Sequence, residues 1–185
     1  MEKKIDLRVK KTYMALTRSL KELLKHKNFY DITVNEICDN AMVGRGTFYK
    51  HFNDKYDFLT YVVSEIVNEC MNESAETAHS DNLYEYVKVF FDKFIDAFEQ
   101  NKDYFKNMDS YIVNGVVFTP ITVIYNELNN HFQKFYNKND KISSFMAQYL
   151  TIAMVIVIVG TIKGKTQNVD EAKESMYFLL EKLFA

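Results

Sequence analysis

Residues that break helices are scarce in this sequence. Its 185 residues include a single proline and five glycines. A sandwich or barrel of strands of this length needs many tight turns, and glycine and proline are the residues that most often form them. The sequence therefore predicts an all-α fold, which we expect to contain about nine helices.

The first two predicted helices are set by apolar spacing and by a cap. Apolar residues recur at steps of three and four over residues 9–24, which indicates one amphipathic helix. Thr33 and Glu36 form a capping box, in which each side chain bonds the backbone N–H of the other. A second helix is therefore predicted over residues 34–41.

A third, short helix is predicted to begin at about Gly44. It places Phe48 and Phe52 on its buried face, because residues four apart lie on one side of a helix. Two short helices joined by a brief turn and backed by a longer helix are typical of a helix-turn-helix domain.

Six further helices are predicted from apolar periodicity, over residues 55–74, 83–98, 104–112, 120–135, 143–162 and 170–184. Asn53 and Asp54 are expected to cap the first of these. Thr119 is expected to cap the fourth, with Pro120 as its first helical residue.

Charge divides the chain into two unlike parts. Residues 1–55 carry 12 Lys or Arg and 7 Asp or Glu, a net charge of +5. Residues 56–185 carry 11 and 18, a net charge of -7, so the total of -2 averages two opposite values. We predict a basic helix-turn-helix domain over residues 1–55 and an acidic helical domain over residues 56–185.

A basic helix-turn-helix domain indicates DNA binding, because phosphate contacts supply affinity and side chains in the major groove read sequence. Arg45 can pair with guanine or phosphate, and Gly46 allows close backbone approach. Alternatively, Tyr49 packs against Tyr30, and His51 is an ordinary surface histidine. The candidate DNA contacts are Thr33, Gly44, Arg45, Gly46, Thr47, Tyr49, Lys50, His51 and Lys55.

Residues 8–59 resemble the N-terminal domain of TetR/AcrR-type transcriptional regulators. The resemblance rests on the run from Thr33 to Cys38 and on the Tyr-Lys-His-Phe-Asn-Asp-Lys segment over residues 49–55. Two positions depart from the pattern: Met42 stands where the family commonly has Gly, and Gly44 where it commonly has Ser or Thr. Neither change is expected to alter the fold, but both leave the operator sequence and the phosphate contacts open.

The segment from Phe145 to Ile162 runs 18 residues without a charge, which is the lower limit for a membrane span. A membrane helix and a helix buried in the protein or at a subunit interface are the alternatives, and the interruptions at Gln148 and Thr151 favour the buried helix. The resemblance implies homodimerisation through the last two long helices. The expected interface residues are Phe145, Tyr149, Ile152, Ile156, Met176, Leu179, Leu180 and Leu183.

The resemblance also implies a small-molecule effector site in the second domain, although ordinary core packing is the alternative for every residue there. The acidic balance of this domain favours a neutral or cationic compound. The candidate pocket residues are Phe94, Met108, Tyr111, Tyr125, His131 and Met154.

No motif for catalysis, metal binding or a cofactor is present, and the four histidines are spread along the chain. Cys38 and Cys70 are expected to be buried thiols, and the absence of a signal peptide predicts a cytoplasmic protein. The sequence thus predicts a regulator that binds operator DNA as a dimeric repressor and is released by an effector. The alternative is a helical adaptor of the same fold that does not bind an operator.

Overall fold

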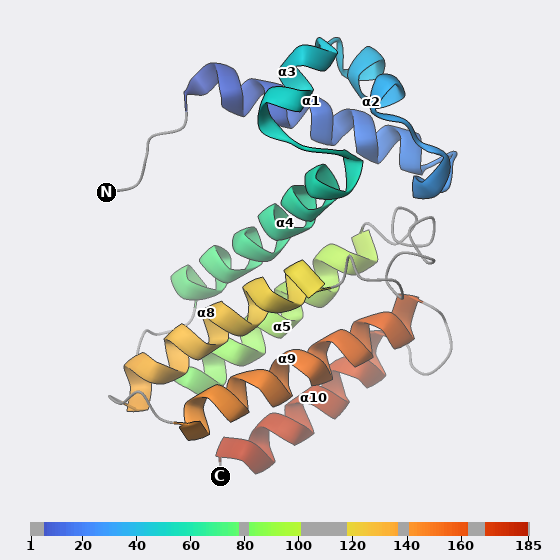
Figure 1. The fold of residues 1–185 in the computed structure, drawn as a ribbon. Coiled ribbons are helices and arrows are strands. Elements are labelled where there is room, and N and C mark those ends of the chain that lie inside the picture. The colour runs from blue at the N-terminus through green and yellow to red at the C-terminus, as the bar shows by residue number, and fades with distance from the viewer. Residues whose placement is uncertain (1–5, 78–81, 101–117, 137–140, 163–168, 185) are drawn as a thin grey trace.

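The computed structural model describes residues 6–77, 82–100, 118–136, 141–162 and 169–184. All regular secondary structure in these ranges is helical, which confirms the all-α prediction. Figure 1 shows a small group of helices standing on a larger bundle. In chain order the elements are α1 (Leu7–Leu24), the 3-10 helix η1 (Phe29–Asp31), α2 (Val34–Ala41), α3 (Arg45–His51), α4 (Lys55–Thr77), α5 (Leu83–Gln100), α8 (Phe118–Tyr136), α9 (Lys141–Ile162) and α10 (Val169–Phe184).

The smaller group, which we call the head, consists of α1, η1, α2 and α3. Its core is built on fully buried side chains from each of its elements, including Leu16, Leu20, Phe29, Ile37 and Phe48. The predicted helix-turn-helix arrangement is therefore present in the structure.

One buried hydrogen bond joins the first two helices of the head. The Ser19 hydroxyl of α1 donates to the Ile37 carbonyl of α2 over 2.8 Å, and Ser19 is 3% exposed. Because a buried hydroxyl without a partner is costly, this bond selects one arrangement of α1 against α2.

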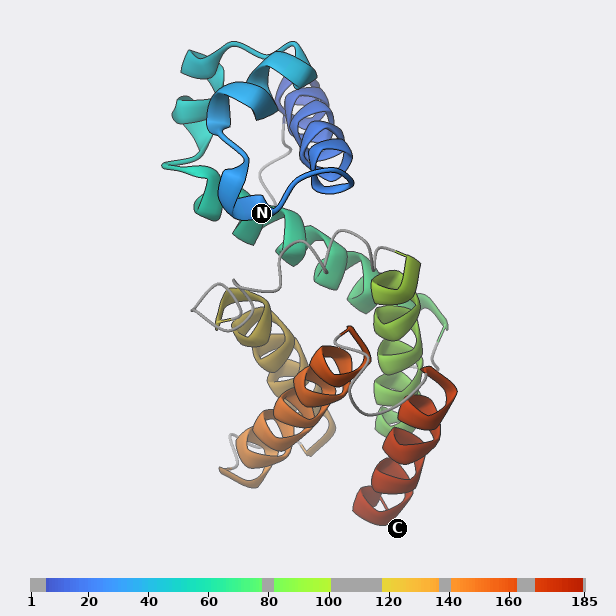
Figure 2. The same ribbon diagram turned by 90° about the vertical axis from the view of Figure 1, so that its right-hand side faces the viewer.

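The larger group, which we call the body, consists of α5, α8, α9 and α10 with the second half of α4. Figure 2 shows these helices gathered into a bundle below the head. Its core is rich in aromatic side chains, among them Phe90, Phe91, Phe94 and Phe132. The apolar periodicity in the sequence correctly indicated α5 and α10 and most of α8 and α9.

Helix α4 belongs to both cores. Its first half places Phe58 and Leu59 in the core of the head, while Val67 and Met71 in its second half lie in the core of the body. The predicted domain boundary at residue 55 coincides with the first residue of α4. The head core, however, extends about two turns beyond that boundary.

Two helix starts differ from the sequence predictions. Helix α8 begins at Phe118, so Thr119 and Pro120 lie inside its first turn instead of capping and opening it. Proline is tolerated there because the first four N–H groups of a helix have no acceptor within the helix. Helix α9 begins at Lys141, two residues before the predicted start. The helix predicted over residues 104–112 lies outside the described residues.

Two further expectations concern the apolar helix and the cysteines. No helix in the described part of the chain is long and apolar enough to span a membrane. Cys38 and Cys70 are both buried, as predicted, and burial raises the pKa of each thiol.

The buried bond between α1 and α2 generates a stability prediction. Ser19→Ala removes the donor to Ile37, and we expect it to lower the free energy of unfolding by about 1 kcal/mol. The measurement is urea unfolding followed by circular dichroism. Thr12→Ala is the matched control, because the Thr12 hydroxyl bonds only the Arg8 carbonyl of its own exposed helix turn. Equal effects of the two substitutions would contradict the role given to Ser19.

Candidate nucleic-acid interface

Helix α3 is anchored from one side by aromatic residues. Phe48 is fully buried, and its ring lies 5.5 Å from that of Phe52 and 5.6 Å from that of Phe58 on α4. Since α3 is only seven residues long, this single anchored side fixes which of its side chains point outward.

The outward side of α3 carries most of the predicted DNA contacts. Gly44, Arg45, Gly46, Thr47, Tyr49 and Lys50 are all exposed. Tyr49 is 56% exposed although its ring touches the edge of Phe48, so it is not covered by packing. These groups supply a guanidinium, an ammonium and two hydroxyls on one surface, which is a set suited to phosphates and base edges.

His51 lies differently from its neighbours. It is half-buried, and its ring packs edge-on against Tyr13 of α1 at 5.3 Å. This contact fixes the end of α3 against α1, a role that the sequence did not indicate.

Arg45 has a polar neighbour on α2. Its guanidinium donates to the Asn35 side-chain oxygen over 3.4 Å, which is a long and exposed hydrogen bond. Such a bond costs little to break, so Arg45 remains able to turn toward DNA. Asn35 was not among the predicted residues, and its place in the first turn of α2 was the only available signal.

Two glycines, Gly44 before α3 and Gly46 in its first turn, leave space at the start of this helix. A Cβ added to Gly46 would have no atom within 4 Å, so packing does not require glycine there. Gly44 is the N-cap of α3 and makes no side-chain capping bond. The missing hydroxyl noted in the sequence therefore removes a cap, while the backbone at Gly46 is open to close approach.

Thr33 is engaged in the capping box of α2. Its hydroxyl accepts from the Glu36 N–H over 3.2 Å, and its backbone N–H donates to the Glu36 carboxylate over 2.9 Å, which confirms the predicted box. The hydroxyl also donates to this carboxylate over 2.9 Å. Lys27 pairs with the same carboxylate, and this pair, with the Thr33 bonds, lowers the Glu36 pKa to about 2. The Thr33 hydroxyl thus has protein partners in this structure, and its contact with DNA stays a prediction.

Lys55 is also occupied within the protein. Its ammonium donates to the carbonyls of Phe29, Tyr30 and Ile32 over 3.1, 2.7 and 2.7 Å. The sequence made this cation a candidate DNA contact, but the structure directs it toward η1. A phosphate contact by Lys55 therefore stays a prediction, to which we return below.

The turn between α2 and α3 contains an uncommon backbone conformation. Met42 has a φ of 54°, in the left-handed region, and its side chain is 96% exposed. The bulky side chain therefore points into solvent and does not crowd the turn. The energetic cost of Met42 lies in its backbone, because a residue with a Cβ is strained in the left-handed conformation.

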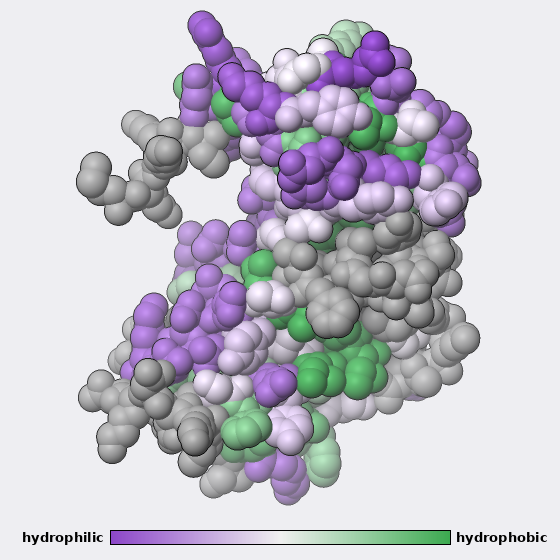
Figure 3. Space-filling model, viewed as in Figure 1, coloured by the Kyte–Doolittle hydropathy of each residue, from purple (hydrophilic) through white to green (hydrophobic). Residues whose placement is uncertain are grey.

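A second exposed surface lies on the last two helices. Apolar side chains at Phe145, Tyr149, Ile152 and Ile156 of α9, and at Phe178, Leu179 and Leu183 of α10, are all exposed. Figure 3 shows hydrophobic atoms gathered on the lower part of the molecule, whereas the head above is mostly hydrophilic. We call these seven residues the apolar stripe. Six of them are predicted dimer contacts, and the sequence missed Phe178.

Two predicted dimer contacts are corrected by the structure. Met176 is 2% exposed and Leu180 is fully buried, both in the core of the body. Together with the buried Ala172 they step by four along α10, so they form its inner side, while Leu179 and Leu183 lie beside them on the outer side. Apolar character alone could not separate these two sides.

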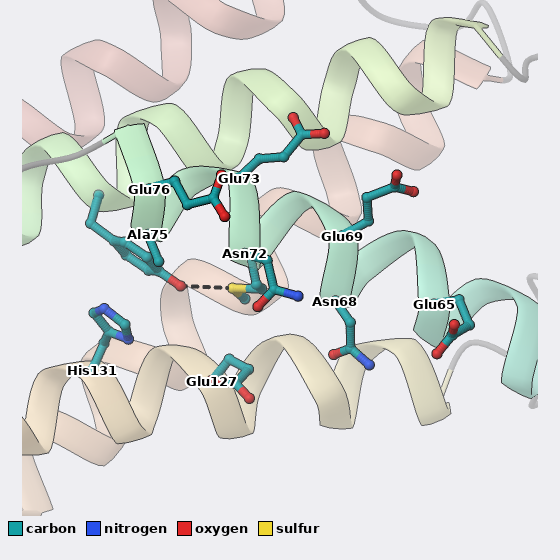
Figure 4. A pocket seen from close by; sticks show the side chains of 11 residues that line it. Glu65, Asn68, Glu69, Asn72, Glu73, Ala75, Glu76, Glu127 and His131 are labelled. Carbon is teal, nitrogen blue, oxygen red and sulfur yellow. Dashed lines mark hydrogen bonds between the residues drawn. The ribbon is translucent and has the colours of Figure 1, made fainter. Parts of the chain in front are cut away.

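A cavity of about 800 Å³ lies between α4, α5 and α8. Figure 4 shows its side chains: Glu65, Asn68 and Asn72 of α4 lie on the side of Glu127 and His131 of α8, whereas Glu69 and Glu73 point away from α8. Its lining residues are Glu65, Asn68, Glu69, Met71, Asn72, Glu73, Ala75, Glu76, Tyr86, Glu127 and His131. The glutamates of α4 step along one side of the helix, a signal in the sequence that the pocket prediction overlooked.

Of the four predicted pocket residues that the structure describes, one lines this cavity. His131 does so, whereas Phe94 and Met154 are buried in the core of the body and Tyr125 packs against it. For these three, core packing is the better description. Met108 and Tyr111 lie outside the described residues.

The cavity is acidic with one flat aromatic wall. The rings of His131 and Tyr86 stack with their centroids 3.8 Å apart, and the Tyr86 hydroxyl donates to the Met71 sulfur over 3.0 Å. Burial lowers the His131 pKa, an effect that Lys134 increases and Glu127 opposes. The imidazole is therefore neutral near pH 7 and does not offset the carboxylates. Among the described residues no group of three His, Cys, Asp or Glu side chains could hold a metal ion.

Comparison with known proteins matches the head most clearly. Residues 16–62 fit the family model described as bacterial regulatory proteins, tetR family. The HTH-type transcriptional regulator SAB2452 of Staphylococcus aureus is 31% identical over 84 residues, which cover 44% of each chain. The transposon Tn10 TetC protein of Escherichia coli is 35% identical over 51 residues, or 28% of this chain and 26% of that protein. The match thus spans less than half the length of these curated relatives.

Solved structures match nearly the whole chain. A TetR transcriptional regulator from Rhodococcus sp. RHA1 aligns with a TM-score of 0.74 at 12% identity, over 95% of this chain and 97% of that one. The TetR transcriptional regulator from Streptococcus agalactiae 2603V aligns with a TM-score of 0.61 at 18% identity, over 94% and 95%. At such low identity these likenesses establish the fold, a helix-turn-helix head on a helical body.

The left-handed residue in the turn generates a prediction. We expect Met42→Gly to raise the free energy of unfolding by about 1 kcal/mol, because glycine adopts a positive φ without the strain of a Cβ. Met42→Ala is the control, since it shortens the side chain but keeps the Cβ. Urea unfolding would contradict this explanation if the alanine variant gained as much stability as the glycine variant.

Proposed function

We propose that this chain, whose N-terminal domain belongs to the tetR family of bacterial regulatory proteins, is a DNA-binding transcriptional regulator that works as a homodimer. The observation that carries this proposal is the outward side of α3. It presents Arg45, Thr47, Tyr49 and Lys50 to solvent from a domain whose sequence has a net charge of +5. A recognition helix of this kind enters the major groove while surrounding cations meet phosphates.

The homodimer part of the proposal is supported by the apolar stripe. Monomeric soluble proteins rarely expose a continuous apolar surface across two helices, and obligate dimer interfaces are apolar like a divided core. One recognition helix reads only a few base pairs, so two copies related by symmetry give the specificity that a regulator needs.

The effector part of the proposal rests on the acidic cavity. Five glutamates line it, of which Glu73 is paired with Lys93, and together with a neutral, flat aromatic wall they suit an organic cation with an apolar body. Helix α4 lines the cavity with its second half and packs into the head with its first. A ligand that separates α4 from α8 would therefore tilt the head and lower operator affinity, so effector and operator would oppose each other. We propose a repressor that is released in this way.

The DNA-binding proposal is tested by the salt dependence of affinity. We expect the protein to bind a fragment from upstream of its own gene, with an affinity that falls steeply as salt rises from about 50 to 200 mM. Arg45→Ala should weaken binding roughly tenfold or more, and Lys50→Ala should reduce the salt slope by about 1 per subunit. Fluorescence anisotropy with a labelled fragment measures both effects.

Lys93→Ala is the control for the DNA measurement, because Lys93 lies on α5 and pairs with Glu73 in the body. It should leave DNA affinity unchanged. If no upstream fragment is bound at about 50 to 100 mM salt, where phosphate contacts are strong, the adaptor alternative replaces the regulator.

The effector proposal is tested with two ions of equal shape and opposite charge. Tetraphenylphosphonium should raise the melting temperature with concentration, whereas tetraphenylborate should not. Glu69→Gln and Glu127→Gln should each weaken the cation effect, because each removes a carboxylate from the cavity. The control is Glu174→Gln, which changes an exposed carboxylate on α10. Equal stabilisation by both ions, or an unchanged response of the cavity variants, would rule out a cationic effector.

A further inference from the structure

Lys55, the first residue of α4, makes three hydrogen bonds to residues outside its own helix. An ammonium has three N–H donors, and here all three are directed at backbone carbonyls of one short segment, at 3.1, 2.7 and 2.7 Å. The carbonyls belong to Phe29, Tyr30 and Ile32. The arrangement is a tripod that ties the first residue of α4 to η1.

Aromatic rings surround the same ammonium. Its nitrogen lies 5.1 Å from the ring centroid of Phe29, 5.7 Å from that of Tyr30 and 5.4 Å from that of Tyr56. A cation near aromatic faces gains electrostatic stabilisation, so these rings favour the ammonium in the place where the carbonyls receive it. Phe29 is itself fully buried in the head core, and the segment that Lys55 holds is therefore anchored.

The tripod lies at the start of the reading helices. Ile32 directly precedes Thr33, the N-cap of α2, so the bond to Ile32 holds the residue next to the start of α2. The Val43 N–H donates to the Cys38 carbonyl over 2.9 Å, which joins α2 to the turn before α3. The bonds of Lys55 therefore join α4 to η1, the backbone continues from η1 into α2, and the Val43 bond joins α2 to the turn before α3.

The bonds of Lys55 differ in kind from the apolar contacts between α4 and the head. Phe58 and Leu59 pack in the head core, but apolar contacts are not directional and permit small sliding movements. Three short hydrogen bonds to one ammonium permit much less, because their energy depends on distance and angle. Of the contacts between α4 and the head, the three hydrogen bonds of Lys55 therefore constrain the orientation of the head relative to α4 most strongly.

We propose that Lys55 is a positioning residue, which locks the DNA-reading helices to α4, and that it is not a phosphate contact. A phosphate contact would require the ammonium to leave three carbonyls and three rings. The DNA part of the inference rests on the proposed function, whereas the lock itself can be tested without DNA.

The test compares Lys55→Met, Lys55→Arg and Lys50→Ala with the wild-type dimer at 10 °C, after circular dichroism has shown each to be folded. In Lys55→Met we expect affinity for the upstream fragment to fall on the order of tenfold while its salt slope stays unchanged, because no phosphate contact is lost. Lys55→Arg should also lose affinity, because a planar guanidinium cannot reproduce the tripod. Lys50→Ala should lower the slope, as above.

Three outcomes of the DNA measurement would overturn the proposal. A salt slope lowered by about 0.9 per subunit in Lys55→Met would show a direct phosphate contact. Full affinity in Lys55→Arg would show that a positive charge is sufficient. Unchanged affinity in a folded Lys55→Met protein would show a role in stability alone.

Hydrogen exchange tests the lock independently of DNA. In Lys55→Met the amides of Tyr30, Asp31, Ile32 and Thr33 should exchange faster, while those of α8 and α10 should not change. If the wild-type protein binds no DNA, the proposed function is refuted. The exchange measurement then still tests whether Lys55 holds η1 and the start of α2 to α4. Unchanged exchange in these four amides would overturn the proposed positioning role of Lys55.

Discussion

The structure depends most on the double burial of α4. A helix of 23 residues contributes Phe58 and Leu59 to one core and Val67 and Met71 to another, so neither core is complete without it. Burying apolar surface is the main favourable term in folding. A movement of α4 against the body therefore carries the head with it, which makes α4 the mechanical link between head and body.

The separation of charge follows the same division. The near-neutral total of -2 conceals a basic head and an acidic body. In the structure the positive side chains of α3 face solvent, while glutamates of α4 line the cavity in the body. A ligand attracted to those carboxylates would touch the helix that carries the head. Electrostatics and packing thus support one account, in which the body binds an effector and the head binds DNA.

Features decided by neighbouring residues could be predicted from the sequence, whereas features decided by tertiary contacts could not. The capping box at Thr33 and Glu36 is local, and it correctly gave the start of α2. Lys55 was expected to contact DNA, and its carbonyl partners were missed because they lie 23 to 26 residues earlier in the chain, a separation that no sequence motif reveals. Likewise, only the packed structure shows that Leu180 faces the core and Leu179 faces solvent.

The central claim is that two such heads read DNA together. Hydroxyl-radical footprinting of the protein on the fragment upstream of its own gene tests it most directly. The account predicts two protected stretches on one face of the duplex, with centres separated by about one helical turn, 10 to 10.5 base pairs, or a multiple of it. A single protected half-site, or no protection at about 50 to 100 mM salt, would contradict the account.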